Sequence, residues 1–179
     1  MVIRFKSNQT KKLHESIEDS NVKDIWLENF DGTADSVSRI CKILGLERDD
    51  ITEAYIPYGI TKICEEAFKY CTSLKSITIP DSVTRIDAEA FCYCESLESI
   101  DIPNSVKVIG NSAFEHCESL TSVTIPNSVT RIGEHAFERC KSLTSVTIPN
   151  SITRISNGTF EGCSELTNIN VPDSMMSIG

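Results

Sequence analysis

Cysteine and histidine are the residue types in this 179-residue chain that are best suited to metal binding or nucleophilic catalysis. Their tightest grouping comprises Cys92, Cys94, His116 and Cys117. Thiolate and imidazole groups bind zinc, and a cysteine activated by a histidine can act as a nucleophile. However, the chain has no Cys-x-x-Cys pair, no oxyanion motif accompanies Cys92 and His116, and the glycines are too scattered for a phosphate-binding loop. The sequence therefore predicts no catalytic residue, metal ion or cofactor, and a metal- or cysteine-dependent enzyme is the least favoured alternative.

The spacing of the cysteines has a simpler explanation, because five of the eight recur every 23 residues. This column comprises Cys71, Cys94, Cys117, Cys140 and Cys163. All six prolines recur at the same interval, as do columns of leucine, isoleucine or valine, and phenylalanine. The phenylalanine column is Phe68, Phe91, Phe114, Phe137 and Phe160. A fixed period of this length is typical of a solenoid whose coils bury their apolar side chains against one another, and we expect the cysteines to be small, buried, reduced members of that core.

Each repeat reads Leu-x-x-Ile-x-Ile-Pro-x-Ser-Val-x-x-Ile-Gly-x-x-Ala-Phe-x-x-Cys-x-x. The alternating, β-branched segment at residues 77–79 predicts a strand that pairs in parallel with its copies and is closed by the following proline. Residues 128–133 are expected to be extended. Residues 134–140 are expected to form one helical or 3-10 turn that places a phenylalanine inside. Gly110 and Gly133 share a position that favours a positive φ, although Asp87 and Ser156 occupy it in other repeats, so glycine is not required there.

The Ile-Pro, Ser-Val-x-x-Ile-Gly and Ala-Phe-x-x-Cys motifs resemble the BspA-type leucine-rich repeat family, also called the Treponema pallidum repeat class. The resemblance covers about residues 51–179 and implies an α/β fold: a right-handed leucine-rich-repeat solenoid with a parallel β-sheet on the concave face and short helical or 3-10 turns. Members of that family are mostly bacterial surface or protist proteins that adhere to other proteins or to host matrix. The family pattern supplies no catalytic residues.

Residues 1–50 lack the regular repeat, and we expect them to form an α/β N-terminal cap with a degenerate repeat, which precedes the 23-residue repeats of residues 51–179. Trp26, the only tryptophan, is expected to pack in this cap. One face of a predicted helix carries Val37, Ile40, Cys41 and Leu44. Asp35 is the expected N-cap of that helix, and Gly45 is expected to follow its C-terminus.

Composition narrows the classes of partner. A formal net charge of −9 argues against nucleic acid, and no apolar stretch approaches the roughly 18 residues that cross a membrane. The N-terminus shows no apolar segment of a secretory signal. Reduced cysteines favour a cytoplasmic compartment, whereas the family resemblance implies the cell surface or secretion, so the localisation stays open.

The outward-facing strand positions are the expected binding surface for a protein or glycoprotein partner. The candidate residues are Glu53, Tyr55, Thr78, Asp101, Thr124, Thr147 and Asn170. Most are small and polar, so the alternative is a ladder that only favours strand formation, in a protein that serves as a structural spacer within a longer array. A basic row (Lys62, Arg85, Arg131, Arg154) and an acidic row (Glu115, Glu138, Glu161) are expected to be solvated faces with ion pairs between coils.

The C-terminal end of the sequence falls within a repeat, after Ile178 and Gly179. An uncovered coil exposes an apolar layer, here Val171, Met175 and Ile178. We therefore expect further coils beyond this point, or self-association through this end.

Overall fold

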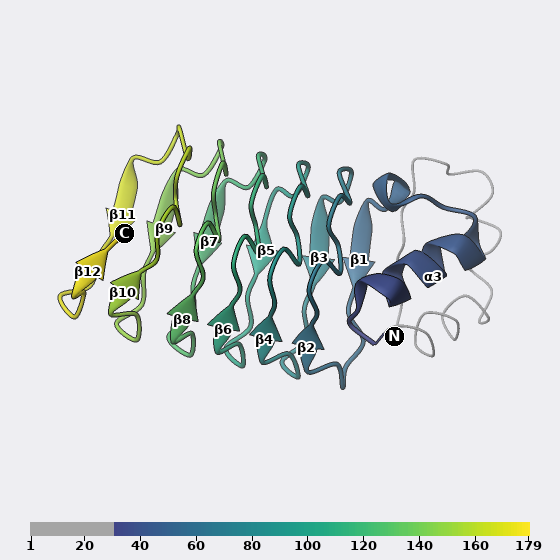
Figure 1. Ribbon diagram of the computed structural model, residues 1–179, viewed down its shortest axis with the longest axis horizontal. Coiled ribbons are helices and arrows are strands. Elements are labelled where there is room, and N and C mark those ends of the chain that lie inside the picture. The colour runs from purple at the N-terminus through teal and green to yellow at the C-terminus, as the bar shows by residue number, and fades with distance from the viewer. Residues whose placement is uncertain (1–30) are drawn as a thin grey trace.

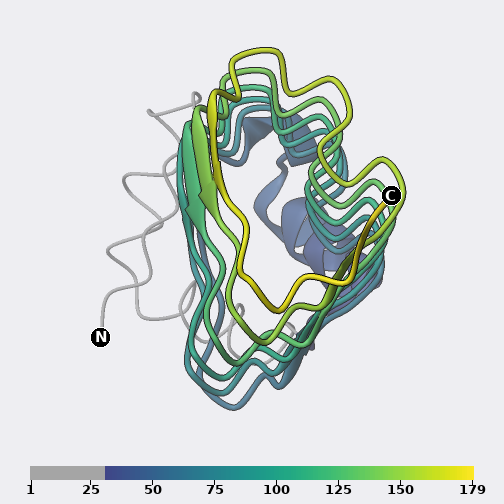
Figure 2. The same ribbon diagram turned by 90° about the vertical axis from the view of Figure 1, so that its left-hand side faces the viewer.

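A computed structural model describes residues 31–179, in which the chain winds into a solenoid of stacked coils (Figure 1). Two series of short strands run along the stack, and the view along it shows successive coils lying over one another (Figure 2). The parallel-strand leucine-rich-repeat architecture expected from the sequence is therefore confirmed. The expectations for residues 1–30, including the packing of Trp26, lie outside the described range.

The first series contains the predicted strands and lies where each repeat reads Ile-x-Ile. Its members are Glu53–Tyr55 (β1), Ser76–Thr78 (β3), Ile100–Asp101 (β5), Ser122–Thr124 (β7), Ser145–Thr147 (β9) and Asn168–Asn170 (β11). β1 pairs with β3, β3 lies beside β5, and β5, β7, β9 and β11 form a continuous parallel sheet. Each residue faces its counterpart 23 positions away, as in Val123 opposite Val146. Each strand ends two residues before its proline, which has no N–H to donate to the sheet.

The second series occupies the segment that was expected to be extended. Its members are Lys62–Ile63 (β2), Arg85–Ile86 (β4), Val108–Ile109 (β6), Arg131–Ile132 (β8), Arg154–Ile155 (β10) and Ser177–Ile178 (β12). β2, β4, β6 and β8 pair in parallel, as do β10 and β12. In each of the first five strands the isoleucine is buried and the preceding residue is more exposed, so this ladder sets out a row of basic side chains above the core.

Each phenylalanine lies in a turn, formed by residues 134–140 and their copies. Unlike a helix, this turn makes hydrogen bonds to the neighbouring coils. The expected 3-10-type contact is present, since the Cys117 N–H bonds to the Phe114 carbonyl at 3.2 Å. The Phe114 N–H, however, donates to the Ala136 carbonyl of the next coil at 2.8 Å. Because alternate N–H groups leave the coil, no continuous helix forms, and we call these segments phenylalanine turns.

Two positions in each phenylalanine turn have a left-handed backbone. They are Glu66 and Tyr70, Glu89 and Tyr93, Ser112 and His116, His135 and Arg139, and Gly158 and Gly162. Only the last pair consists of glycines, which adopt this conformation without steric cost. The other coils therefore keep eight non-glycine residues in a strained conformation, held there by the bonds between coils.

The expectation that Gly110 and Gly133 favour a positive φ is wrong, since neither has one. The reason for glycine is the close approach of the preceding coil. A Cβ on Gly110 would lie 2.4 Å from the carbonyl carbon of Asp87, and one on Gly133 would lie 2.4 Å from the backbone nitrogen of Asn111. The short distance between coils, rather than the local backbone angle, selects glycine at these two places.

The core is a continuous column that extends through the coils. Phe68, Phe91, Phe114 and Phe137 are all fully buried, and their rings stack in sequence with Phe160 at the end. Each member of the cysteine column from the second coil onward donates its S–H to the carbonyl of a phenylalanine 26 residues earlier, at 3.1–3.3 Å. All eight cysteines are free, as expected.

Helix α3 (Ala34–Leu44) and the 3-10 turn η1 (Arg48–Asp50) precede the first coil. Thr33, and not Asp35, is the N-cap: its hydroxyl accepts the Ser36 N–H at 3.1 Å, and Asp35 lies in the first turn. Gly45 ends the helix in the left-handed conformation, as predicted. Val37, Ile40 and Cys41 are buried in the common core, and the guanidinium of Arg48 donates to two carbonyls of the first phenylalanine turn. A separate cap domain of residues 1–50 stays a prediction.

Candidate functional site

The exposed side of the first sheet brings the predicted recognition residues into one surface, which we call the long-strand face. Parallel pairing places Tyr55 beside Thr78, Asp101 beside Thr124, and Thr147 between Thr124 and Asn170. From Thr78 to Asn170 every member of this row is exposed, whereas Tyr55 is half-buried. Val123 and Val146, which alternate with them, are buried in the core, so the pleat of the strands holds the polar row outward.

A second row lies two residues earlier on the same face. It begins at Glu53, which is half-buried opposite Ser76, and continues with the exposed Ser99, Ser122, Ser145 and Asn168. The two rows together offer hydroxyl, amide and carboxylate groups with little side-chain bulk. Such a surface can form many short hydrogen bonds with an extended or flat partner, and its acidic and aromatic groups lie toward the β1 end and at Asp101.

The basic row on the second strand series divides into two halves. In the first, the carboxylate of Asp87 bridges Lys62, at 2.8 Å, and Arg85, so the expected ion pair between coils is present there. Burial alone would raise the pKa of Asp87, but its hydrogen bonds with Lys62 and Arg85 lower it below its ordinary value. Val108 interrupts the row because it pairs with both Arg85 and Arg131.

The second half of the basic row is not neutralised in this way. Gly133 and Ser156 stand where Asp87 stands in the earlier coil, and neither Arg131 nor Arg154 has an ion pair within residues 31–179. Both arginines line a shallow groove of about 430 Å³ together with Asn111, Thr130, Glu134 and Ser156. The groove is a local basic surface on a chain of net charge −9.

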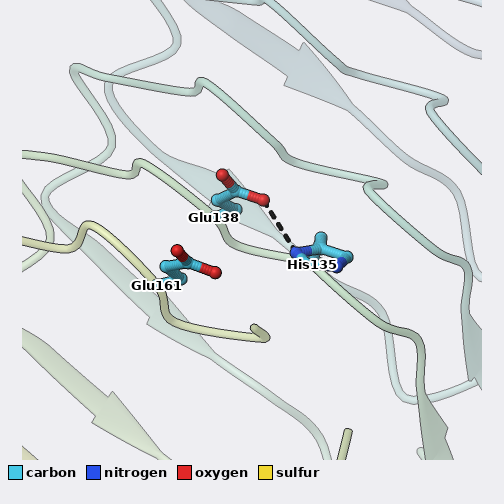
Figure 3. Close-up of side chains that lie close together, drawn as sticks. All are labelled: His135, Glu138 and Glu161. Carbon is cyan, nitrogen blue, oxygen red and sulfur yellow. Dashed lines mark ion pairs between the residues drawn. The ribbon is translucent and has the colours of Figure 1, made fainter. Parts of the chain in front are cut away.

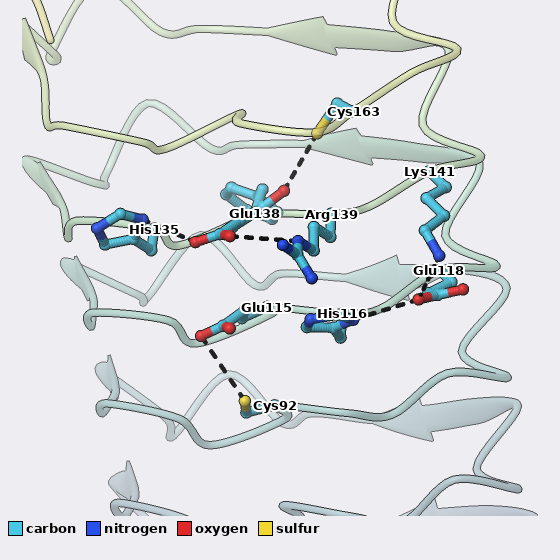
Figure 4. Close-up of polar contacts among 10 residues, drawn as sticks. Cys92, Glu115, His116, Glu118, His135, Glu138, Arg139, Lys141 and Cys163 are labelled. Atoms are coloured by element: carbon cyan, nitrogen blue, oxygen red, sulfur yellow. Dashed lines mark hydrogen bonds and ion pairs between the residues drawn. The ribbon is translucent and has the colours of Figure 1, made fainter.

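The grouping of Cys92 with His116 does not form a nucleophilic pair. Cys92 is buried, and its sulfur lies 3.9 Å from a carboxylate oxygen of Glu115. Figure 4 shows the two side chains pointing toward each other. The His116 ring stacks on Tyr93, with centroids 4.3 Å apart, and its Nδ1 lies 3.2 Å from Glu118. Desolvation by burial, with a contribution from Glu115, raises the pKa of Cys92 to about 12, so the reactive thiolate is scarce at neutral pH.

The other two cysteines of the possible zinc-binding group, Cys94 and Cys117, are also part of the core. Cys94 and Cys117 are fully buried and donate to the carbonyls of Phe68 and Phe91. Burial raises the pKa of both thiols, whereas zinc binds the thiolate form. The structure therefore offers no support for a metal or cysteine site at these residues.

A different cluster lies on the phenylalanine turns of the last two complete repeats. From the sequence, its two glutamates were expected only to belong to a solvated acidic row. Its members are His135, Glu138 and Glu161 (Figure 3). One potential ligand atom from each residue lies within 4.8 Å of the others. The 23-residue register places Glu138 and Glu161 in one column, but only the turn geometry shows that His135 points toward the same place.

The C-terminal edge of the solenoid exposes apolar side chains. Ile169, Val171 and Ile178 are exposed and surround a cavity of about 390 Å³ together with Ile155 and Phe160. The predicted apolar layer is thus present, although Met175 is partly buried against the core. Self-association through it stays a prediction. Among residues 31–179, no helix is long and apolar enough to span a membrane.

Comparison with known proteins agrees with this geometry. The family model of the BspA-type leucine-rich repeat region matches in six copies, over residues 46–114 and 84–179. A leucine-rich repeat protein from Bacteroides ovatus is 41% identical with a TM-score of 0.70, over 73% of this chain and 34% of that one. The Treponema pallidum leucine-rich repeat protein is 37% identical with a TM-score of 0.71, over 73% of this chain and 61% of that one.

A leucine-rich cell surface protein from Faecalibacterium prausnitzii is also similar, at 36% identity and a TM-score of 0.64, over 66% of this chain and 31% of that one. The chain therefore spans between about a third and three fifths of the length of these structures. No curated protein matches the chain significantly.

Proposed function

Because this chain belongs to the BspA-type leucine-rich repeat family, we propose that it is a non-catalytic recognition scaffold that binds a protein or glycoprotein partner through its long-strand face. The observation that carries the proposal is the exposed row from Thr78 to Asn170, which stands on a rigid, fully buried core. A preformed surface loses little conformational entropy on binding, so many modest hydrogen bonds can add up to specific recognition. The similar leucine-rich protein from Faecalibacterium prausnitzii is a cell surface protein, which supports a role in contacts with other molecules.

The chemistry of the described residues favours recognition over catalysis. Cys92 and Cys94 are buried with a raised pKa, and the histidine nearest to Cys92 in the register stacks on Tyr93 instead. An enzyme at that place would require an accessible thiolate beside a general base. A structural spacer, by contrast, would need the core but not the long-strand face, so substitutions on this face distinguish the two functions.

The proposal is tested by screening the purified chain against an array of extracellular matrix and cell-surface proteins, and then measuring each partner by surface plasmon resonance. The double variant Thr124→Arg/Thr147→Arg places two bulky charges on exposed positions of the face. We expect it to weaken binding by about tenfold or more, as desolvated interface positions do. The matched control is Asn127→Arg/Asn150→Arg, at exposed turn positions after the prolines, which should leave binding nearly unchanged.

Equal loss of binding in both double variants would mean that the partner does not bind specifically through the long-strand face. Wild-type affinity in the face variant would have the same meaning. Absence of any partner for the wild-type chain would favour the spacer. Circular dichroism and urea unfolding of all the variants separate loss of binding from loss of folding.

A further inference from the structure

The cluster of His135, Glu138 and Glu161 joins two neighbouring coils. His135 and Glu138 lie on one phenylalanine turn, with Nδ1 2.8 Å from a carboxylate oxygen of Glu138, and Glu161 lies on the next. Figure 3 shows the three side chains converging on the same space. The other carboxylate oxygen of Glu138 lies 3.5 Å from the guanidinium of Arg139, so one oxygen faces the arginine and the other faces the histidine.

Nδ1 of His135 faces the carboxylate of Glu138 without forming a hydrogen bond of good geometry. This nitrogen is also inaccessible to water. A shielded imidazole nitrogen that lies beside a carboxylate oxygen but lacks a well-formed hydrogen bond is suited to share a bound cation with that oxygen. Nδ1 is also the atom through which a neutral imidazole binds a metal, when its Nε2 carries the proton.

Glycine in the next coil leaves the space beside this nitrogen open. A Cβ on Gly158 would lie 2.3 Å from Nδ1 of His135 and 3.3 Å from a carboxylate oxygen of Glu161. Any other residue would therefore intrude between the histidine and the glutamate. The equivalent positions in the first two coils are occupied by Glu66 and Glu89, so the open space is particular to this end of the solenoid.

Two related clusters in the same chain already contain a cation. On the first coils, the ammonium of Lys69 lies between the carboxylates of Glu66 and Glu89. At His116, the carboxylate of Glu118 is paired with Lys141 at 2.8 Å (Figure 4). At His135 the guanidinium of Arg139 lies 3.5 Å from one oxygen of Glu138, but Glu161 has no ion pair among the described residues. Two glutamates from adjacent coils therefore lie close together with only one of them paired, and like charges in register destabilise the pairing.

We propose that His135, Glu138 and Glu161 bind a divalent first-row transition metal such as Zn²⁺, which bridges the two coils. One imidazole nitrogen and two carboxylate oxygens form a three-ligand set that zinc accepts, with a water in the fourth tetrahedral position. Tetrahedral ligands at about 2.0–2.1 Å from zinc lie roughly 3.3 Å apart. The ligand atoms of the cluster lie within 4.8 Å of one another, and rotation of the exposed Glu161 side chain would bring its carboxylate closer to the other two. Imidazole makes calcium or magnesium a poorer fit than zinc, cobalt or manganese.

The test is a competition titration of the reduced chain with Zn²⁺ and a fluorescent zinc chelator. We expect one ion per chain. The variants Glu161→Gln and His135→Asn should each weaken binding about tenfold or more, a loss typical of perturbed metal sites. Asparagine suits position 135 because it tolerates the left-handed backbone, where φ is 56°. His116→Asn is the matched control, since φ is 57° there and a glutamate also faces that histidine, and its affinity should equal that of the wild type.

A second measurement separates this cluster from the cysteines. Co²⁺ bound by nitrogen and oxygen gives only weak visible absorption, whereas thiolate ligands add an intense near-ultraviolet charge-transfer band. The expected spectrum lacks that band. Absence of binding at millimolar Zn²⁺, unchanged affinity in both Glu161→Gln and His135→Asn, or a thiolate band would each overturn the proposal.

Discussion

The ring of Phe91 lies nearly parallel to the ring of Phe114, with centroids 5.2 Å apart and 6° between the planes. The next pair, Phe114 and Phe137, repeats this arrangement at 5.2 Å and 9°. The centroid distance is close to the roughly 4.8 Å spacing of paired strands, so the rings advance with the coils themselves. The aromatic column thus reports directly that coils of equal length lie over one another, which is what creates both the long-strand face and the His135 cluster.

The central phenylalanine should contribute far more stability than the terminal one. Phe114 is fully buried between two other rings, whereas Phe160 is only partly buried at the end of the column. We expect Phe114→Ala to lower the free energy of unfolding by about 3–5 kcal/mol, because it removes apolar contacts and leaves a cavity. Phe160→Ala should cost clearly less. Urea unfolding followed by circular dichroism measures both, and equal losses would contradict a continuous core.

The recurring place of serine in the repeat is explained by a ladder of serine hydroxyls that bond to the preceding coil. Each of these hydroxyls should contribute less to the free energy of unfolding than Phe114 does. Ser128 donates to the carbonyl of Val106 at 2.7 Å, and Ser105 and Ser151 make the same contact in neighbouring coils. Ser128→Ala should lower the free energy of unfolding by about 1 kcal/mol, since it removes a hydrogen bond between coils. Ser122→Ala, on the exposed sheet, is the matched control and should change stability by less than about 0.5 kcal/mol.

Relief of backbone strain in a phenylalanine turn should stabilise the protein. Ser112 has φ 51°, and the same position is glycine at Gly158 in the fifth repeat. A left-handed backbone costs a non-glycine residue about 1–2 kcal/mol, and glycine recovers part of this despite its larger unfolded-state entropy. We therefore expect Ser112→Gly to raise the free energy of unfolding by about 0.5–1 kcal/mol.

The reverse change supplies the comparison. Gly162 has φ 72°, and a Cβ there would lie 3.0 Å from the side chain of Arg139. Gly162→Ala should lower the thermal midpoint, while Ser112→Gly raises it. Midpoints that move in the same direction for both variants would mean that the left-handed backbone does not govern stability at these positions.

Stability should fall in alkaline solution because of the buried thiols. Burial raises the pKa of Cys41 to about 11 and those of Cys71 and Cys92 to about 12. In the unfolded chain these thiols ionise near pH 9, so above that pH the unfolded state binds fewer protons than the native state. Their contribution is therefore complete below about pH 8.5 and is lost as the pH rises toward 11–12, at about 1.4 kcal/mol per pH unit for each thiol.

The alkaline loss is measured as urea midpoints at pH 8, 9 and 10 in the presence of a reductant. Cys92→Ala removes one thiol at a position that the neighbouring repeats fill with Glu115 and Glu138, so the fold tolerates change there. Its stability should decline less steeply with pH than that of the wild type. A wild-type stability that is constant to pH 10 would contradict the burial of the thiols.

Most of the architecture follows from the sequence because each coil repeats the same physical requirements. Isoleucine and valine at alternate positions form strands, proline ends them, and Phe114 and its copies fill the core. The N-cap of α3 was harder to predict, since both Thr33 and Asp35 are good N-cap residues and only the geometry selects Thr33. At Gly110 the space for a side chain is limited by the backbone of a neighbouring coil, which the local sequence does not reveal.

The polar surfaces were predicted less completely. The alternation of the strands was enough to place Thr124 and Thr147 outward on the long-strand face. The cluster at His135 depends on the directions in which side chains leave the phenylalanine turns. These directions are set by two left-handed residues in each turn, and in four of the five turns neither residue is a glycine that would have revealed the left-handed backbone from sequence. The division of the basic row arises because Gly133 and Ser156 stand at the positions equivalent to Asp87, and the effect appears only when the neighbouring coils are known.

Amide hydrogen exchange measured by NMR tests the stacking of the coils most directly. The N–H groups of Phe91, Phe114 and Phe137 each donate to the next coil, at 2.8–2.9 Å, and the side chains of these residues are fully buried. These amides should exchange only through global unfolding, whereas that of Asn127, in an exposed turn, should exchange rapidly. Exchange at Phe114 as fast as at Asn127 would contradict coils joined through their phenylalanine turns.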